Sequence, residues 1–194
     1  MPNWCNNILI IHGTEHALTS FMTAARTEDS RFSMGVFFPM PEELRGTSSP
    51  NRAPDGEKQA LIEKYGAADW YDWAIANWGT KWDFTAEHVS EDIEDGEVEI
   101  EFETAWGPPE KFLEKLAAKF PNLSFVHRYA ESGMGFGGDV TYRNGEAVTA
   151  HYAGNSEDAA MLSEWHALAM GSDWEDVVQD ADDADESNNN EGGE

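Results

Sequence analysis

Carboxylates are the side chains best suited to chemistry in this sequence, and seven of them crowd into residues 92–103, one of which, Asp95, belongs to the predicted turn. Every second residue from 97 to 103 is a glutamate. On a β-strand alternate side chains point to one face, so the four glutamates would form a line with a spacing of about 6.6–6.8 Å. A line of negative charge can imitate phosphates or hold a basic protein surface. The six acids of this candidate surface are Asp92, Glu94, Glu97, Glu99, Glu101 and Glu103.

A hairpin is expected to position these acids, because Asp95-Gly96 is a strong signal for a two-residue type I′ turn. With this turn as the loop, Asp92 would face Glu99 across the hairpin. Like charges opposite one another destabilise a sheet by about 0.2–1 kcal/mol a pair, so we expect an external partner to offset the cost. The apolar side chains predicted on the opposite face are Val89, Ile93, Val98, Ile100 and Phe102.

The net charge of −26 narrows the class of partner. It arises from 38 acids against 12 lysines and arginines, and residues 131–194 contain sixteen acids and one base. Nucleic-acid binding requires a basic surface, so the charge argues against direct contact with DNA or RNA. An acidic protein attracts basic partners instead, although solubility alone is the simpler interpretation. Three acids of a predicted C-terminal helix extend the candidate contact surface: Asp173, Glu175 and Asp176.

A second group of residues combines charge with aromatic rings. Lys81 and Asp83 lie in the segment "WGTKWDF", whose alternation predicts a strand over residues 78–84. With four other side chains they could form an aromatic-lined polar pocket of the kind found in active sites. The alternative is that the charged side chains pair across the sheet and the tryptophans belong to the core. The four other side chains are Trp78, Trp106, His127 and Glu131.

The remaining motifs do not point to a cofactor or a metal. The stretch "GMGFGG" at 133–138 fits the dinucleotide fingerprint, but its glycines lead into a predicted strand rather than a helix. His12 and His16 lack the intervening glutamate of a zinc-binding helix, and the single Cys5 cannot form an intramolecular disulfide. With no Ser-His-Asp spacing and no phosphate-binding loop, we expect no cofactor, no metal site and no catalytic residues.

The predicted elements belong to the α+β class. Their order over the first 130 residues is strand, helix, strand, strand, helix, strand, which predicts a ferredoxin-like antiparallel sheet with helices. We also expect an α-helical insertion at about 40–77, an extra C-terminal hairpin and acidic C-terminal helices. The predicted segments are strands at 4–12, 33–38, 78–84, 123–130, 139–143 and 146–152, and helices at 13–26, from 57 and at 108–120.

Three regions follow from this organisation. We expect one domain over residues 1–153, an acidic helical extension over 154–179 and a disordered acidic tail over 180–194, which lacks apolar residues. No apolar run approaches the roughly 18 residues that a membrane span needs, and the first residues lack the basic region of a secretion signal. The protein is therefore predicted to be cytoplasmic and to have no membrane partner.

Five motifs resemble the YubB-like family of phage and plasmid proteins. They are, in order, "MPNWCNNILIIHG", "FPMPEEL", "NWGTKWDF", "FETAWGPP" and "YAESGMGFGG", and they span about residues 1–140. The resemblance implies a ferredoxin-like domain and a setting in mobile elements that act inside a bacterial host cell. It carries over no catalytic residues, because the family has no settled activity.

In that setting, host nucleases and CRISPR complexes present DNA-binding grooves lined with lysine and arginine. We therefore expect a non-enzymatic inhibitor of host defence that binds a basic, nucleic-acid-binding host protein, in the manner of a DNA mimic. Two other classes stay open. One is a small enzyme or ligand-binding domain that uses the pocket near Lys81 and Asp83, and the other is a structural or assembly factor. The sequence does not indicate an oligomeric state.

Overall fold

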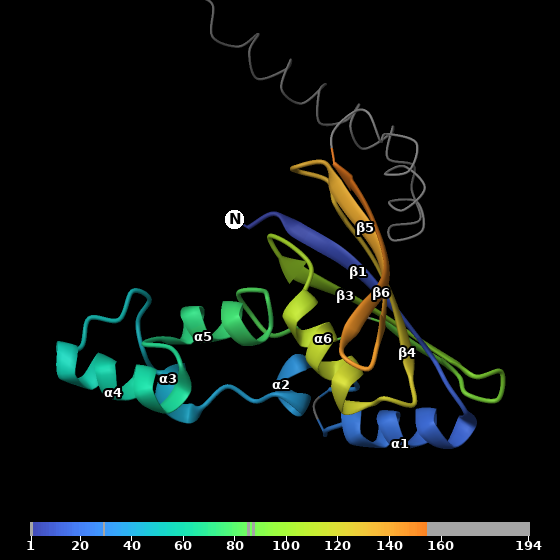
Figure 1. Cartoon of the computed structure of the whole chain (residues 1–194), viewed down its shortest axis with the longest axis horizontal. Coiled ribbons are helices and arrows are strands. Elements are labelled where there is room, and N and C mark those ends of the chain that lie inside the picture. Colours follow the sequence, from blue (N-terminus) through green and yellow to red (C-terminus); the bar gives the residue numbers. More distant parts are fainter. Residues whose placement is uncertain (1, 29, 85, 87, 155–194) are drawn as a thin grey trace, which may run out of the picture.

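A six-stranded antiparallel sheet forms the centre of the molecule (Figure 1). The computed structural model describes residues 2–28, 30–84, 86 and 88–154. The strand order is β2-β3-β1-β4-β5-β6. The first four of these strands have the arrangement of a ferredoxin-like sandwich, and β5 with β6 is the additional hairpin. The predicted α+β class and ferredoxin-like sheet are confirmed. The strands are β1 (Trp4–His12), β2 (His88–Asp92), β3 (Glu97–Ala105), β4 (Ser124–Glu131), β5 (Phe136–Arg143) and β6 (Glu146–Gly154).

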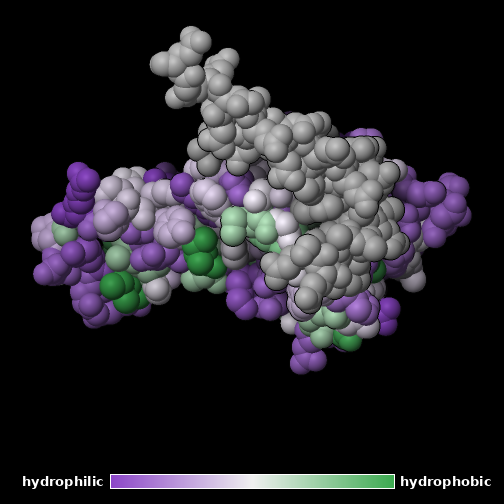
Figure 2. All heavy atoms as spheres, turned by 90° about the horizontal axis from the view of Figure 1, so that it is seen from above, coloured by the Kyte–Doolittle hydropathy of each residue, from purple (hydrophilic) through white to green (hydrophobic). Residues whose placement is uncertain are grey.

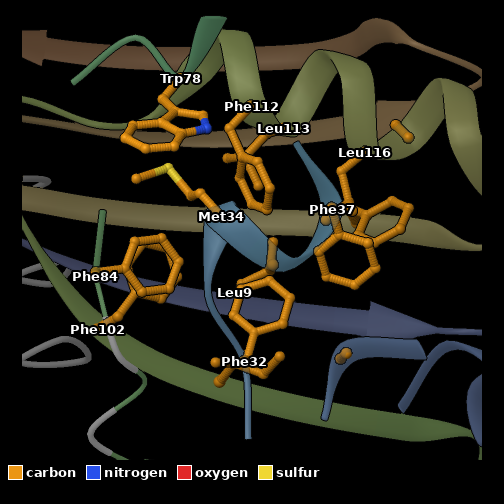
Figure 3. Close-up of a cluster of buried hydrophobic side chains, with 14 of the residues drawn as sticks. Leu9, Phe32, Met34, Phe37, Trp78, Phe84, Phe102, Phe112, Leu113 and Leu116 are labelled. Atoms are coloured by element: carbon orange, nitrogen blue, oxygen red, sulfur yellow. The ribbon is translucent and has the colours of Figure 1, made fainter. Parts of the chain in front are cut away.

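Two helices, α1 (Glu15–Ala25) and α6 (Glu110–Lys119), supply apolar side chains to a core on one face of the sheet. Thr14 begins α1, where its hydroxyl oxygen accepts a hydrogen bond from the Ala17 N–H at 3.3 Å. Aromatic rings dominate the core, and the rings of Phe84 and Phe102 stack with centroids 3.8 Å apart. Figure 3 shows part of this cluster, including Leu9, Phe32, Phe84, Phe102 and Phe112.

Four short helices lie between α1 and β2. They are α2 (Met34–Phe37), α3 (Glu42–Arg45), α4 (Asp55–Tyr65) and α5 (Trp70–Asn77). Figure 1 shows α3, α4 and α5 projecting to one side of the sheet. Helix α4 has no buried side chain, whereas α5 buries Trp73 and Ala74. The Asp69 carboxylate caps α5, since it accepts hydrogen bonds from the N–H groups of Tyr71 and Asp72 at 3.0 Å each.

Two segments that were predicted as strands have other structures. Residues 33–38 contain α2, whose first N–H groups, from Met34 and Gly35, donate to the Asp83 carboxylate. Residues 78–84 form turns. In this second segment Trp78 and Phe84 are buried, whereas Trp82 is 39% exposed. Its alternation therefore reflects a loop that returns repeatedly to the core, and the predicted strand is wrong.

The predicted register of the β2–β3 hairpin is also wrong. Asp92 lies opposite Glu97 rather than Glu99, and the loop has four residues, 93–96, rather than two. The side chain of Ile93 packs against the core, and its carbonyl accepts a hydrogen bond from the Gly96 N–H at 3.1 Å. A shift of two residues keeps every side chain on its predicted face. The buried face is accordingly as expected, with Val89, Val98, Ile100 and Phe102 inside.

The predicted acidic C-terminal helices with Asp173, Glu175 and Asp176, and the predicted tail at 180–194, lie outside the described residues. None of the helices in the described part of the chain has the length and apolar character that a membrane span needs.

The turn between β5 and β6 provides a test of the fold. Asn144 and Gly145 have φ of 52° and 85°, as a type I′ turn requires. A Cβ on Gly145 would also lie 2.9 Å from the Ala118 Cβ of α6. We expect Gly145→Ala to lower the free energy of unfolding by about 1–2 kcal/mol in urea denaturation.

Gly46→Ala is the matched control. Gly46 has φ of −86°, and a Cβ there would meet nothing within 4 Å. This variant should be as stable as the wild type or slightly more stable, because alanine restricts the unfolded chain. Equal stability of the two variants would contradict the steric argument for Gly145.

Candidate functional site

The strands β2 and β3 carry five of the six predicted acids on the sheet face opposite the helix-covered core. The glutamates at 97, 99, 101 and 103 are half-buried, Asp92 is exposed, and Glu94 is exposed in the turn. The neighbours of the central acids are uncharged or weakly basic. Glu99 lies between Ser90 and Ile10, and Glu101 lies between His88 and Ile8. The line of carboxylates is therefore present, and it contains a single pair of directly opposed acids, Asp92 and Glu97.

Cations of the described residues leave the middle of this line unpaired. His12 Nδ1 lies 3.5 Å from Glu97 Oε2 at the end of the line. Arg26 and Arg31 both bind Glu91, whose side chain lies on the other face of β2. Within the described part of the chain, the side chains of Glu99 and Glu101 form no ion pair. No cation of the described residues therefore neutralises these two carboxylates.

Three members of the predicted pocket serve the fold instead. Trp78 is buried, and its indole N–H donates to the Phe38 carbonyl at 3.0 Å, so the ring lies in the core as Figure 3 shows. The Asp83 carboxylate accepts three backbone N–H groups, from Met34, Gly35 and Phe84. Burial raises the pKa of Asp83, and those donors offset part of the shift.

Glu131 holds the glycine-rich turn rather than a pocket. It is buried, and its two carboxylate oxygens accept the N–H groups of Gly133 and Met134 at 2.8 and 2.7 Å. The turn leads into β5, so the glycines precede a strand as the sequence indicates. A Cβ at position 133 would come within 3 Å of the side chains of Glu131 and Asn3, so close packing accounts for the glycine at this position.

Lys81 and Trp106 are the two predicted pocket residues that the structure brings together. They line a surface cleft of about 460 Å³ between α5 and the end of β3. A second cleft of about 280 Å³ adjoins it and shares Tyr71, Lys81 and Trp106. Sequence reasoning missed Tyr71 and Ile75. The two residues are four apart on α5, so their side chains lie on one face of the helix, and they are 36% and 39% exposed. A large side chain on the face of α5 that does not pack on the core was the available signal. The remaining lining residues are Gly79, Thr80, Ala105 and Gly107 in the first cleft, and Ser49 and Trp70 in the second.

A buried polar network links the central strands. His127 Nε2 lies 2.9 Å from Asn7 Oδ1, while the Asn7 amide nitrogen donates to Thr104 Oγ1 at 2.9 Å. Because the amide oxygen must accept, Nε2 carries a hydrogen. Its Nδ1 has no hydrogen-bond partner among the described residues. The ring packs between Phe102 and Tyr129, and burial lowers the pKa of His127 to about 3.

Comparison with known proteins bears on the fold. Residues 77–170 match the family described as "Ferredoxin-like domain in Api92-like protein". The crystal structure of the protein Api92 from Yersinia pseudotuberculosis is similar, with a TM-score of 0.50 and 12% sequence identity over 80% of this chain and 99% of that chain. None of the curated proteins compared with the chain matches it. At such an identity the structural likeness shows the fold, and the ferredoxin-like domain is confirmed.

The buried imidazole predicts a pH dependence of stability. The unfolded chain binds a proton at this histidine below about pH 6.5, whereas the folded chain does not, so stability falls as the pH falls. Between pH 7.5 and 5.0 this group should lower the free energy of unfolding by about 2 kcal/mol, measured by urea denaturation. His127→Gln, which can still donate to Asn7, should lose most of this dependence. If the stability of His127→Gln depended on pH as strongly as that of the wild type, the pH dependence would come from other groups.

Proposed function

We propose that the protein binds a lysine- and arginine-rich surface of another protein through the carboxylates of β2 and β3. The proposal rests on the alternation of side chains along β3. The apolar side chains are buried in the core, and the glutamates lie on the opposite face of the sheet. Successive carboxylates on that half stand about 6.6–6.8 Å apart. Glu99 and Glu101, at the centre of the line, form no ion pair within the described residues.

The position of the acids in the sheet supports access by a partner. Strand β2 is at the edge of the sheet, and β3 is next to it. Asp92, an exposed acid of β2, lies opposite Glu97 of β3, so the negative surface continues from β3 to the edge of the sheet. The next cation on this face, Arg128 of β4, is engaged by Asp139 at 3.0 Å. Among the described residues, no cation competes with the positive groups of a partner for Glu99 and Glu101.

The finer proposal concerns the identity of the partner. A regular line of carboxylates resembles the charge of a nucleic-acid strand, which suits a protein that ordinarily holds DNA or RNA. The sequence motifs that resemble YubB-like phage and plasmid proteins supply the setting, a bacterial host in which such a partner belongs to a defence system. Under this proposal the protein is an inhibitor that occupies the nucleic-acid groove and has no catalytic step.

The test compares capture of host proteins by two variants of equal charge. The wild type is immobilised and a bacterial lysate is passed over it at about 50 mM and then about 500 mM salt, because exposed charge pairs are screened within about 10 Å at 0.1 M. Glu99→Gln with Glu101→Gln should retain roughly two- to thirty-fold less of a nucleic-acid-binding protein, the range expected for two exposed ion pairs. The retained proteins are identified by mass spectrometry.

Glu57→Gln with Glu63→Gln provides the control, since both side chains are exposed on α4, away from the sheet. This variant changes the net charge equally and should retain the partner as the wild type does. Equal losses in both variants would mean that only net charge matters. A partner that stays bound at high salt, or binds all three proteins alike, would contradict an acidic docking surface.

A further inference from the structure

Beyond the acidic surface, the structure has an aromatic cleft with the opposite electrostatic character. Tyr71, Lys81 and Trp106 are common to the two adjoining clefts beside α5. The chain has more than three acids for every base, yet no aspartate or glutamate lines either cleft. The coloured part of the face shown in Figure 2 is mostly hydrophilic.

Trp106 is held in a conformation that a bulky residue rarely adopts. Its φ is 72°, in the left-handed region, which costs of the order of 1–3 kcal/mol. Three hydrogen bonds fix the segment. The Trp106 N–H donates to the Asn3 carbonyl at 2.9 Å, and the hydroxyls of Thr80 and Thr104 donate to the carbonyls of Ala105 and Gly107 at 3.0 and 2.8 Å. The result is an indole that is 54% exposed on a rigid support, which is the usual arrangement of a stacking platform.

Lys81 adds a cation to this platform. Its Nζ lies 4.2 Å from the centroid of the Trp82 ring, which is itself 39% exposed. Lys81 forms no ion pair with any described residue, although most lysines of the described chain do or are hydrogen-bonded. An ammonium group that lies over an aromatic ring and forms no ion pair with a described residue is suited to an anionic ligand.

We propose that this cleft binds a nucleoside monophosphate, with the base on Trp106 and Tyr71 and the phosphate at Lys81. Stacking on an exposed indole suits any flat base, and one lysine suits one phosphate. The volume of about 460 Å³ falls within the range of small-molecule sites. A longer nucleic acid is disfavoured, because the net charge of −26 repels a polyanion.

Calorimetric titration with AMP, adenosine and inorganic phosphate tests the proposal on the full chain. AMP should bind more tightly than either fragment. Trp106→Ala should weaken AMP binding by roughly five- to hundred-fold, as loss of one stacked base does, and Trp106→Phe should restore part of it. Lys81→Gln, a change at a half-buried loop residue outside the hydrophobic core, should weaken AMP binding roughly ten-fold and leave adenosine binding unchanged.

Two further variants make the result specific. Tyr152→Ala removes a ring that is 58% exposed on β6, and it should bind AMP like the wild type. Glu99→Gln with Glu101→Gln should do so too, which separates this site from the acidic surface. Absence of binding by AMP, GMP, CMP and UMP at millimolar concentration would overturn the proposal. So would equal binding of adenosine and AMP, equal binding of phosphate and AMP, or tighter binding of a single-stranded oligonucleotide.

Discussion

The burial of alternate side chains of β3 is the constraint on which both faces of the sheet depend. Val98, Ile100 and Phe102 are almost fully buried, and Phe102 stacks on Phe84 while approaching Phe32 with centroids 6.5 Å apart. Because a strand has a period of two, these contacts oblige the intervening glutamates to lie on the opposite face. A slip of one residue would bury carboxylates and expose the aromatic ring, so the core itself fixes where the acids stand.

Much of the fold could be predicted from local patterns, since several elements contain their own start and stop signals. Thr14 caps α1, Pro109 precedes α6, and Asn144-Gly145 forms the predicted type I′ turn. The loop of the acidic hairpin could not be predicted in the same way. Asp95-Gly96 favours a two-residue turn, but residues 93–96 form a four-residue loop in which Ile93 packs against the core and its carbonyl accepts the Gly96 N–H.

The segment 78–84 shows why alternation alone is an incomplete guide. Its large residues reach the core through individual contacts, namely the Trp78 indole to the Phe38 carbonyl and the Phe84 ring on Phe102, rather than through a strand ladder. The same segment then explains the candidate pocket. Asp83 is committed to the start of α2, whereas Lys81 lines a cleft together with Trp106. That cleft depends on contacts between residues far apart in the sequence.

Charge relates the two candidate surfaces to each other. The acids of β2 and β3 repel any polyanion that approaches the molecule, and this repulsion extends over about a Debye length, near 8–10 Å at physiological salt. A small ligand with one phosphate loses little to that field once it lies against Lys81, whereas a DNA strand would meet it along its whole length. Under the two proposals, the charge that would attract a basic protein to one face also limits the cleft to small anions. Raising the salt concentration should therefore weaken binding of the protein partner more than binding of the nucleotide, because stacking of a base on Trp106 is not a charge–charge interaction that salt screens.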